Sequence, residues 1–124
     1  MKPATLANSE LAIMELLWAE QPLTARQIRE RLYPDERRPQ HGTVQRLLQR
    51  LEDKGFVARD RGLAVHLFAP TLSREAYAGA QLESLADKLT GGSLAPFLTH
   101  LMDHKRLSRA EIDRLRRILE GGEA

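Results

Sequence analysis

The sequence predicts a mainly α-helical fold that contains one small β-hairpin. Apolar residues recur at helical spacing along most of the chain, as in Val44, Leu47, Leu48 and Leu51. The helical spacing of apolar residues stops in residues 56–70, where β-branched and aromatic residues flank a turn signal. With 124 residues, of which 42% are hydrophobic and 29% charged, the chain has room for one domain and a small appendage.

Two helices are expected at the start of the chain. The first runs from about Ser9 to Ala19, and Asn8 or Ser9 can cap it. Thr24 is the N-cap candidate of the second helix, which has the sequence "ARQIRERL". The apolar face of the first helix is expected to consist of Leu11, Met14, Leu17 and Trp18.

A third helix is expected to begin at Thr43, in "TVQRLLQRLEDKGFV", and Gly55 is suited to a left-handed C-cap. Acids enter this helix only at Glu52 and Asp53, although the helix macrodipole favours acids at the start and bases at the end. The side of the helix opposite its apolar stripe carries Gln45, Arg46, Gln49 and Arg50. This reversed order indicates that the start of the helix faces a polyanion.

The hairpin follows directly. Val57 is expected in its first strand and Val65 to Phe68 in its second, with Gly62 in the turn "DRG". The order helix, helix, turn, helix, hairpin is typical of a winged helix-turn-helix, in which the last helix enters the major groove of DNA. Arginine there reads guanine and glutamine reads adenine, and an acid would be repelled by phosphate.

The predicted partner is therefore double-stranded operator DNA. Thr24 and Arg26, at a helix N-terminus, and Arg61, on the wing, are expected at phosphates. The alternatives are a cap for Thr24 and solvated side chains for the arginines. The complete set of predicted DNA-contacting residues is Thr24, Arg26, His41, Thr43, Gln45, Arg46, Gln49, Arg50 and Arg61.

Pro70 marks the expected boundary between a DNA-binding domain, residues 1–70, and a helical dimerisation domain, residues 71–124. Ser73 caps the first helix of the second domain, Ser93 opens the next, and Ser108 with Glu111 forms the capping box of the last.

Three short amphipathic helices bury little surface alone, so we expect a homodimer, with packing onto the first domain as the alternative. The residues expected at the dimer interface are Leu82, Leu85, Leu89, Leu94, Phe97, Leu98, Leu101, Ile112, Leu115, Ile118 and Leu119.

Composition excludes several classes of protein. The chain has no cysteine, so disulfides, zinc ribbons and a cysteine nucleophile are ruled out. A transmembrane span and a signal peptide are not expected, which predicts a soluble cytoplasmic protein. The net charge is only +2, but residues 24–50 hold seven arginines and three acids, a local charge of +4.

No enzyme, cofactor or metal site is expected. We find no nucleophile beside a base, no phosphate-binding glycine loop and no paired catalytic carboxylates. His100 and His104 are four residues apart, but a zincin motif requires Glu where Leu101 stands, and no third ligand is obvious. A winged-helix adaptor that binds proteins instead of DNA remains the alternative function, although an adaptor has no reason to exclude acids from the third helix.

Three stretches resemble the BlaI/MecI family of winged-helix penicillinase repressors. They are "LANSELAIMELLWAEQPLTARQIRERL", "GTVQRLLQRLEDKGFVARD" and "GGSLAPFLTHLMDHKRLSRAEIDRLRRIL", and together they cover about Ala7 to Leu119. The resemblance implies a homodimeric repressor of a palindromic operator. The positions that approach DNA in the family match Thr43, Gln45, Arg46 and Arg50.

The resemblance also implies regulation. Members that control β-lactam resistance are inactivated by proteolysis in the C-terminal region, in response to a membrane sensor metalloprotease. The family's scissile Asn-Phe pair aligns with about His100-Leu101, so this chain departs from the family at that bond. Copper-responsive relatives carry a C-terminal cysteine cluster that this chain lacks, which excludes a thiolate-based copper switch.

Overall fold

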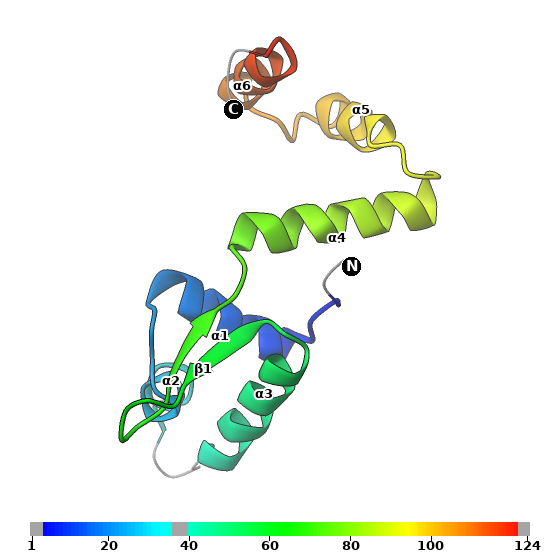
Figure 1. The fold of residues 1–124 in the computed structure, drawn as a ribbon. Helices are drawn as coiled ribbons and strands as arrows, with labels where there is room; N and C mark the ends of the chain where they lie inside the picture. Colours follow the sequence, from blue (N-terminus) through cyan, green and yellow to red (C-terminus); the bar gives the residue numbers. More distant parts are fainter. Residues whose placement is uncertain (1–3, 36–39, 122–124) are drawn as a thin grey trace. The chain divides into compact units, whose positions relative to one another are not determined.

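The computed structural model describes residues 4–35 and 40–121. The elements follow the predicted order of a winged helix with further helices after it (Figure 1). In chain order they are α1 (Asn8–Ala19), α2 (Ala25–Leu32), α3 (His41–Asp53), β1 (Val57–Asp60), β2 (Leu67–Pro70), α4 (Arg74–Leu89), α5 (Ala95–Asp103) and α6 (Arg109–Leu119).

The chain divides into two compact units, residues 1–82 and 83–124. Helix α4 begins in the first unit and ends in the second. The domain boundary that the sequence predicts at Pro70 stays a prediction.

The core of the first unit lies where α1, α2, α3 and the hairpin meet. Strands β1 and β2 are antiparallel, with Val57 opposite Pro70 and Asp60 opposite Leu67. Leu23, before α2, adds a bridge to Phe68 and so joins the hairpin to the helices. The largest fully buried side chains are Phe68, Ile13, Met14, Leu17, Ile28, Leu48, Leu51, Glu10 and Val44.

Glu10 is the one charged residue of that set, and it fastens α1 to the end of α3. Its side chain is only 2% exposed, and Lys54 Nζ lies 2.8 and 2.9 Å from its two carboxylate oxygens. Burial raises the pKa of Glu10. The hydrogen bonds from Lys54 and from the Ala7 amide, with the charges of Lys54 and Arg50, outweigh burial and hold this pKa below its ordinary value.

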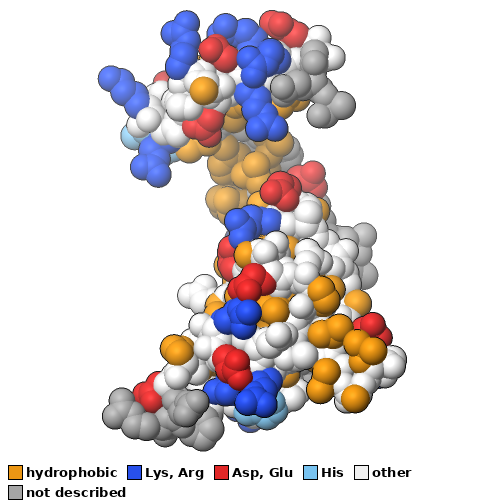
Figure 2. All heavy atoms as spheres, turned by 90° about the vertical axis from the view of Figure 1, so that its left-hand side faces the viewer, with side chains coloured by type: hydrophobic (Ala, Val, Ile, Leu, Met, Phe, Trp, Pro, Cys, Tyr) orange, Lys and Arg blue, Asp and Glu red, His pale blue; other side chains and the backbone are white. Residues whose placement is uncertain are grey.

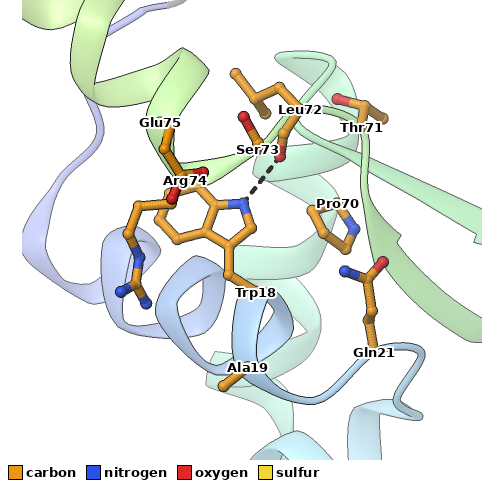
Figure 3. Close-up of a pocket in the computed structure, with 9 residues that line it drawn as sticks. All are labelled: Trp18, Ala19, Gln21, Pro70, Thr71, Leu72, Ser73, Arg74 and Glu75. Carbon is orange, nitrogen blue, oxygen red and sulfur yellow. Dashed lines mark hydrogen bonds between the residues drawn. The ribbon is translucent and has the colours of Figure 1, made fainter. Parts of the chain in front are cut away.

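The start of α4 packs onto the first unit through aromatic side chains. Trp18 Nε1 donates to the Leu72 carbonyl oxygen at 2.9 Å, and the Arg74 guanidinium lies 5.5 Å from the centre of the indole (Figure 3). Tyr77 contacts Phe56 edge to face, and its hydroxyl accepts a hydrogen bond from the Leu6 amide. A hollow of about 570 Å³ lies beside Trp18, and no residue predicted to bind DNA lines it.

Helix α3 ends as the sequence predicts. Gly55 has φ of +84°, its amide donates to the Glu52 carbonyl, and the Phe56 amide donates to the Leu51 carbonyl at 2.8 Å. This pair of bonds is a Schellman motif, which needs the left-handed conformation that glycine adopts without strain.

Three helix starts differ from their predictions. Helix α1 begins at Asn8 after Ala7, whose amide donates to the Glu10 side chain, so neither Asn8 nor Ser9 is the cap. Helix α3 begins at His41, two residues before Thr43, and His41 therefore belongs to it.

The third is α5, which begins at Ala95 with Leu94 as its N-cap and no side-chain cap, so Ser93 does not open it. The Ser93 backbone is instead held in the turn after α4, where its carbonyl accepts from the Thr90 hydroxyl. The capping box at Ser108 and Glu111 is confirmed, with both bonds at 3.0 to 3.1 Å.

The second strand also starts later than predicted. Val65 is 60% exposed in the loop of residues 61–66, and β2 begins at Leu67. The Gly62 amide donates to Asp60 Oδ1 at 2.9 Å and opens this loop, which is longer than a tight turn. Below, "wing" means β1, β2 and the loop that joins them. Within the described residues, no helix is long and apolar enough to cross a membrane.

Candidate DNA-binding surface

Helix α3 separates its two faces as the sequence predicts. Val44, Leu47, Leu48 and Leu51 are buried against the rest of the first unit. The opposite arc is exposed and consists of Gln45, Arg46, Gln49 and Arg50. The first turn of the helix contains no acid. From its start to Arg50 the helix therefore presents amide, guanidinium, imidazole and hydroxyl groups and no carboxylate.

Side-chain contacts within the helix hold residues of the first turns of α3. Gln45 Nε2 lies 3.2 Å from His41 Nε2, and Arg46 Nη2 lies 3.4 Å from Thr43 Oγ1. His41 is exposed and Thr43 is half-buried. Among the described residues, neither Arg46 nor Arg50 forms an ion pair. Both guanidinium groups are therefore open to an outside partner.

A hollow of about 490 Å³ joins α3 to α2 and to the wing. Four of the predicted DNA-contacting residues line it, namely Thr24, Arg26, His41 and Gln45. The wing contributes Arg59 and residues 64–66 and 68 to the same hollow. In Figure 1 the start of α3 and the loop of the wing lie at the same end of the first unit, and Figure 2 shows Arg, Lys and His side chains gathered at that end.

The start of α2 is built by a capping box. Thr24 Oγ1 accepts from the Gln27 amide at 3.1 Å, and Gln27 Oε1 accepts from the Thr24 amide at 2.9 Å. This confirms Thr24 as the cap. Arg26, one position further, is highly exposed and lies 2.9 Å from Glu30. Helix α2 thus directs its N-terminal end and one arginine toward the hollow.

The remaining predicted residues lie outside this hollow. Gln49 donates to Asp53 Oδ1 at 2.9 Å, further along α3. Arg61, on the wing, is about half exposed, and its Nη2 lies 3.5 Å from Glu52 Oε2. The five predicted residues that do not line the hollow are thus Thr43, Arg46, Gln49, Arg50 and Arg61.

Sequence reasoning did not select Arg59, Val65 and His66 as functional residues. Arg59 lies over the ring of Phe68, 4.8 Å from its centre, and its side chain is only 13% exposed. Strand alternation could have found it, because Arg59 is two residues from the buried Val57 and so shares its inward face. Val65 and His66 gave no such signal, since the sequence places them in a strand instead of a loop.

The predicted dimer residues are poorly covered within the single chain. Phe97, Leu101, Ile112 and Leu115 are half-buried. The exposed ones are Leu82, Leu85, Leu89, Leu94, Leu98, Ile118 and Leu119, which range from 41% to 84% exposed. No residue of α5 or α6 is buried. Figure 2 shows hydrophobic side chains at the surface of this part of the chain.

His100 and His104 stack on each other, with ring centres 4.1 Å apart. His104 Nδ1 lies 2.9 Å from the His100 carbonyl oxygen, so one ring nitrogen already faces the backbone. In the described part of the chain, no three His, Cys, Asp or Glu side chains gather into a possible metal site.

Comparison with known protein families matches residues 6–121 to the family described as "Penicillinase repressor". The chain belongs to the penicillinase repressor family. This is a family of transcriptional repressors and not of enzymes. The resemblance read from the sequence is thereby confirmed.

A curated relative and a solved structure both match the chain. It is 36% identical to the protein named transcriptional regulator BlaI in two strains of Mycobacterium tuberculosis, over 125 aligned positions that cover 99% of this chain and 88% of that protein. The solved DNA-binding domain of the repressor BlaI superposes with a TM-score of 0.51 and 21% identity, covering 62% of this chain and 92% of that domain. The latter match confirms the winged-helix fold.

Proposed function

We propose that this protein is a sequence-specific transcriptional repressor that binds a palindromic operator in double-stranded DNA as a homodimer. The observation that carries the proposal is the acid-free, exposed arc of α3 beside a hollow shared with the start of α2 and the wing. An arc of amides and arginines at the start of a helix fits the floor of the major groove, where base edges accept and donate hydrogen bonds.

Two kinds of contact divide the surface. Arg46 and Arg50, with Gln45 and Gln49, supply the groups that discriminate bases, and His41 and Thr43 lie at the entry of the helix. Thr24, Arg26 and Arg61 surround that arc and supply contacts to phosphate, which hold the helix in register. Their proposed phosphate contacts are supported by their positions, because each of these residues lies on an element that adjoins α3.

Dimerisation rests on the uncovered apolar side chains of α4, α5 and α6. Large exposed apolar patches are uncommon on monomeric proteins and mark surfaces that another chain covers. A two-fold homodimer covers them with a second copy of the same surface and presents two α3 helices to the DNA. Such symmetry matches an operator whose half-sites repeat with inverted orientation.

The proposal includes a cytoplasmic location and release of repression by a signal-activated protease, such as a membrane sensor protease. The aligned bond His100-Leu101 lies inside α5, so cutting there requires α5 to unwind. The connections on either side of α5, residues 90–94 and 104–108, offer a protease non-helical backbone instead.

The test is selection of duplexes from a randomised pool with the full chain, followed by titration of the enriched duplex at several salt concentrations. We expect an inverted repeat to be enriched. We also expect log K to fall with log salt by about 0.9 for each phosphate neutralised.

An adaptor that binds proteins would give a different result. It would enrich no sequence, and its affinity for duplex DNA would be weak at every salt concentration. A single half-site without a repeat would retain the DNA-binding function and overturn the palindromic, dimeric part of the proposal.

A further inference from the structure

Glu52 lies close to the proposed DNA contacts, where a negative charge should weaken binding. It is near the end of α3, one helical turn beyond Gln49. Its side chain is only 21% exposed, although it carries a charge. Two arginines of the wing lie at its carboxylate, and Gln49 Nε2 makes a weaker contact of 3.5 Å with Oε1.

The two carboxylate oxygens of Glu52 face different arginines. Oε1 lies 3.2 Å from Arg59 Nη2, and Oε2 lies 3.5 Å from Arg61 Nη2. Arg59 is on β1 and Arg61 on the loop that follows it. One side chain of α3 therefore holds the wing at two points.

Arg59 depends on this carboxylate more than a surface arginine would. Its side chain is 13% exposed and its guanidinium lies over Phe68. Its Nε is buried with no hydrogen-bond partner in the structure, and Nη1 is 3.5 Å from His66 Nδ1, which is a weak contact. Among the described residues, Glu52 is the only carboxylate that neutralises Arg59. Because the Arg59 guanidinium is poorly solvated and Glu52 is its counter-charge, breaking their contact would be costly.

We infer that Glu52 is a positioning residue that fixes the wing against α3, so that both elements fit one operator at the same time. The inference rests on the proposed function and adds a residue that sets its specificity. Phosphate contacts from the wing determine the register in which α3 meets the bases, and a loosened wing would allow several registers. Glu52 thus weakens overall attraction to DNA slightly and improves discrimination between sequences.

Asp53 provides a matched control. It is the next residue, is exposed and carries the same charge. Its side chain accepts from Gln49 within α3, and within the described part of the chain it forms no ion pair with the wing. Asp53→Asn keeps the carbonyl oxygen that accepts from Gln49. Removing its charge tests simple repulsion between an acid and DNA without loosening the wing.

The experiment compares the full chain with its Glu52→Gln, Glu52→Asp and Asp53→Asn variants. Two duplexes are titrated, the one enriched by the wild-type protein and a shuffled duplex of the same composition. All titrations are made well below the melting temperature of each variant. We expect Glu52→Gln to bind the shuffled duplex more tightly and to lower the ratio of the two affinities by about tenfold, the effect of one wrong base pair. Asp53→Asn should tighten both complexes equally and leave the ratio unchanged.

Glu52→Asp is the deciding variant, because it keeps the charge and shortens the side chain by one carbon. If Glu52 positions the wing, Glu52→Asp should lower the ratio of the affinity for the enriched duplex to that for the shuffled duplex. If Glu52 only repels DNA, Glu52→Asp should keep the wild-type ratio. A general loss of folded protein would reduce the active fraction toward both duplexes and would not change the ratio. A wild-type ratio in both Glu52 variants would overturn the inference and leave the proposed function standing. A wild-type protein that prefers no duplex would overturn the proposed function itself.

Discussion

Arginines on the candidate surface differ in how strongly carboxylates of the same chain already hold them. Arg59 is enclosed by Glu52 and Phe68, and Arg61 and Arg26 each lie near one glutamate. Arg46 and Arg50 form no ion pair among the described residues, although the charge of Arg50 acts on Glu10 from beyond ion-pair distance. The least neutralised cations therefore project from the helix that is expected to read the bases.

The first prediction separates base reading from phosphate binding. If Arg46 or Arg50 makes a bidentate contact to guanine, its replacement by alanine should cost about 1–3 kcal/mol at the operator and relax preference at one base pair in each half-site. Arg61→Ala should weaken all duplexes about equally and reduce the salt slope by about one phosphate. Site selection with the three variants in parallel measures both effects. Unchanged base preference in both α3 variants would show that α3 does not read the operator.

The second prediction concerns Glu10 and pH. Its folded pKa lies below the ordinary value of 4.5, so its contribution to stability is complete above that pH and is lost as the pH falls through the folded pKa. Lys54→Met leaves the buried carboxylate without its cation and should cost about 1–3 kcal/mol near pH 7, less than for a fully buried pair because Lys54 is 36% exposed.

Protonation removes the unpaired charge in Lys54→Met, so the difference between variant and wild type should narrow as the pH is lowered from 7 to about 4. Urea unfolding midpoints at one protein concentration measure this difference. Glu10→Gln is the control, since it removes the charge and should make stability less dependent on pH in this range. A Lys54→Met deficit that grows in acid would contradict the assignment.

At the scale of elements, helices α2 and α6 both begin with a capping box, but in different surroundings. Thr24 and Ser108 each form a capping box with the residue three positions on, Gln27 and Glu111. In α6 the hydrogen bonds that Glu111 makes with the backbone and the side chain of Ser108 lower the pKa of Glu111. The start of α2 lines the hollow beside α3, whereas no residue of α6 lines it.

The third prediction uses this pair to separate capping from DNA contact. Aspartate caps helices as well as serine or threonine does, so Thr24→Asp and Ser108→Asp should each leave the free energy of unfolding within about 0.5 kcal/mol. A carboxylate near phosphate costs about 1 kcal/mol at 4 Å even in bulk water. Thr24→Asp should therefore weaken operator binding at least about fivefold, and Ser108→Asp should not. Equal binding by the two variants would assign Thr24 to capping alone.

For the whole molecule, the two units differ in how completely they bury their apolar side chains. The first unit has a closed core that includes Phe68, Ile28 and Leu48, all under 3% exposed. Helices α5 and α6 contain no buried residue, and Leu89 and Leu119 are 62% and 84% exposed. The second unit therefore leaves most of its large apolar side chains exposed within the single chain.

The fourth prediction is that a dimer is lost when this surface is charged. Leu115 is half-buried on α6. The substitution Leu115→Glu should disfavour a dimer interface there, because burying a carboxylate without a partner is costly. Sedimentation velocity should show monomers for Leu115→Glu and dimers for the volume-conserving Leu115→Met. Operator binding should fall sharply in the first variant, because a monomer holds one half-site. A dimer that survives Leu115→Glu would place the interface elsewhere.

The sequence alone determined the order of the elements, the apolar stripe of α3, the left-handed C-cap at Gly55, the N-cap at Thr24 and the capping box at Ser108. These features depend on residues within a few positions of one another, so local chemistry is sufficient to predict them. The family followed from the same patterns, because their order and spacing extend over most of the chain.

Tertiary structure decided the rest. Nothing local pairs Glu10 with Lys54, or Glu52 with Arg59 and Arg61, since each pairing needs elements brought together by the core. The wing loop extends to residue 66 because β2 aligns Phe68 with Arg59 and with Leu23, which strand propensity at Val65 cannot indicate. Burial strengthens these ion pairs, and the burial of each depends on how the whole unit packs. Sequence periodicity therefore predicts the helices, but only the folded unit shows which charged residues of different elements pair.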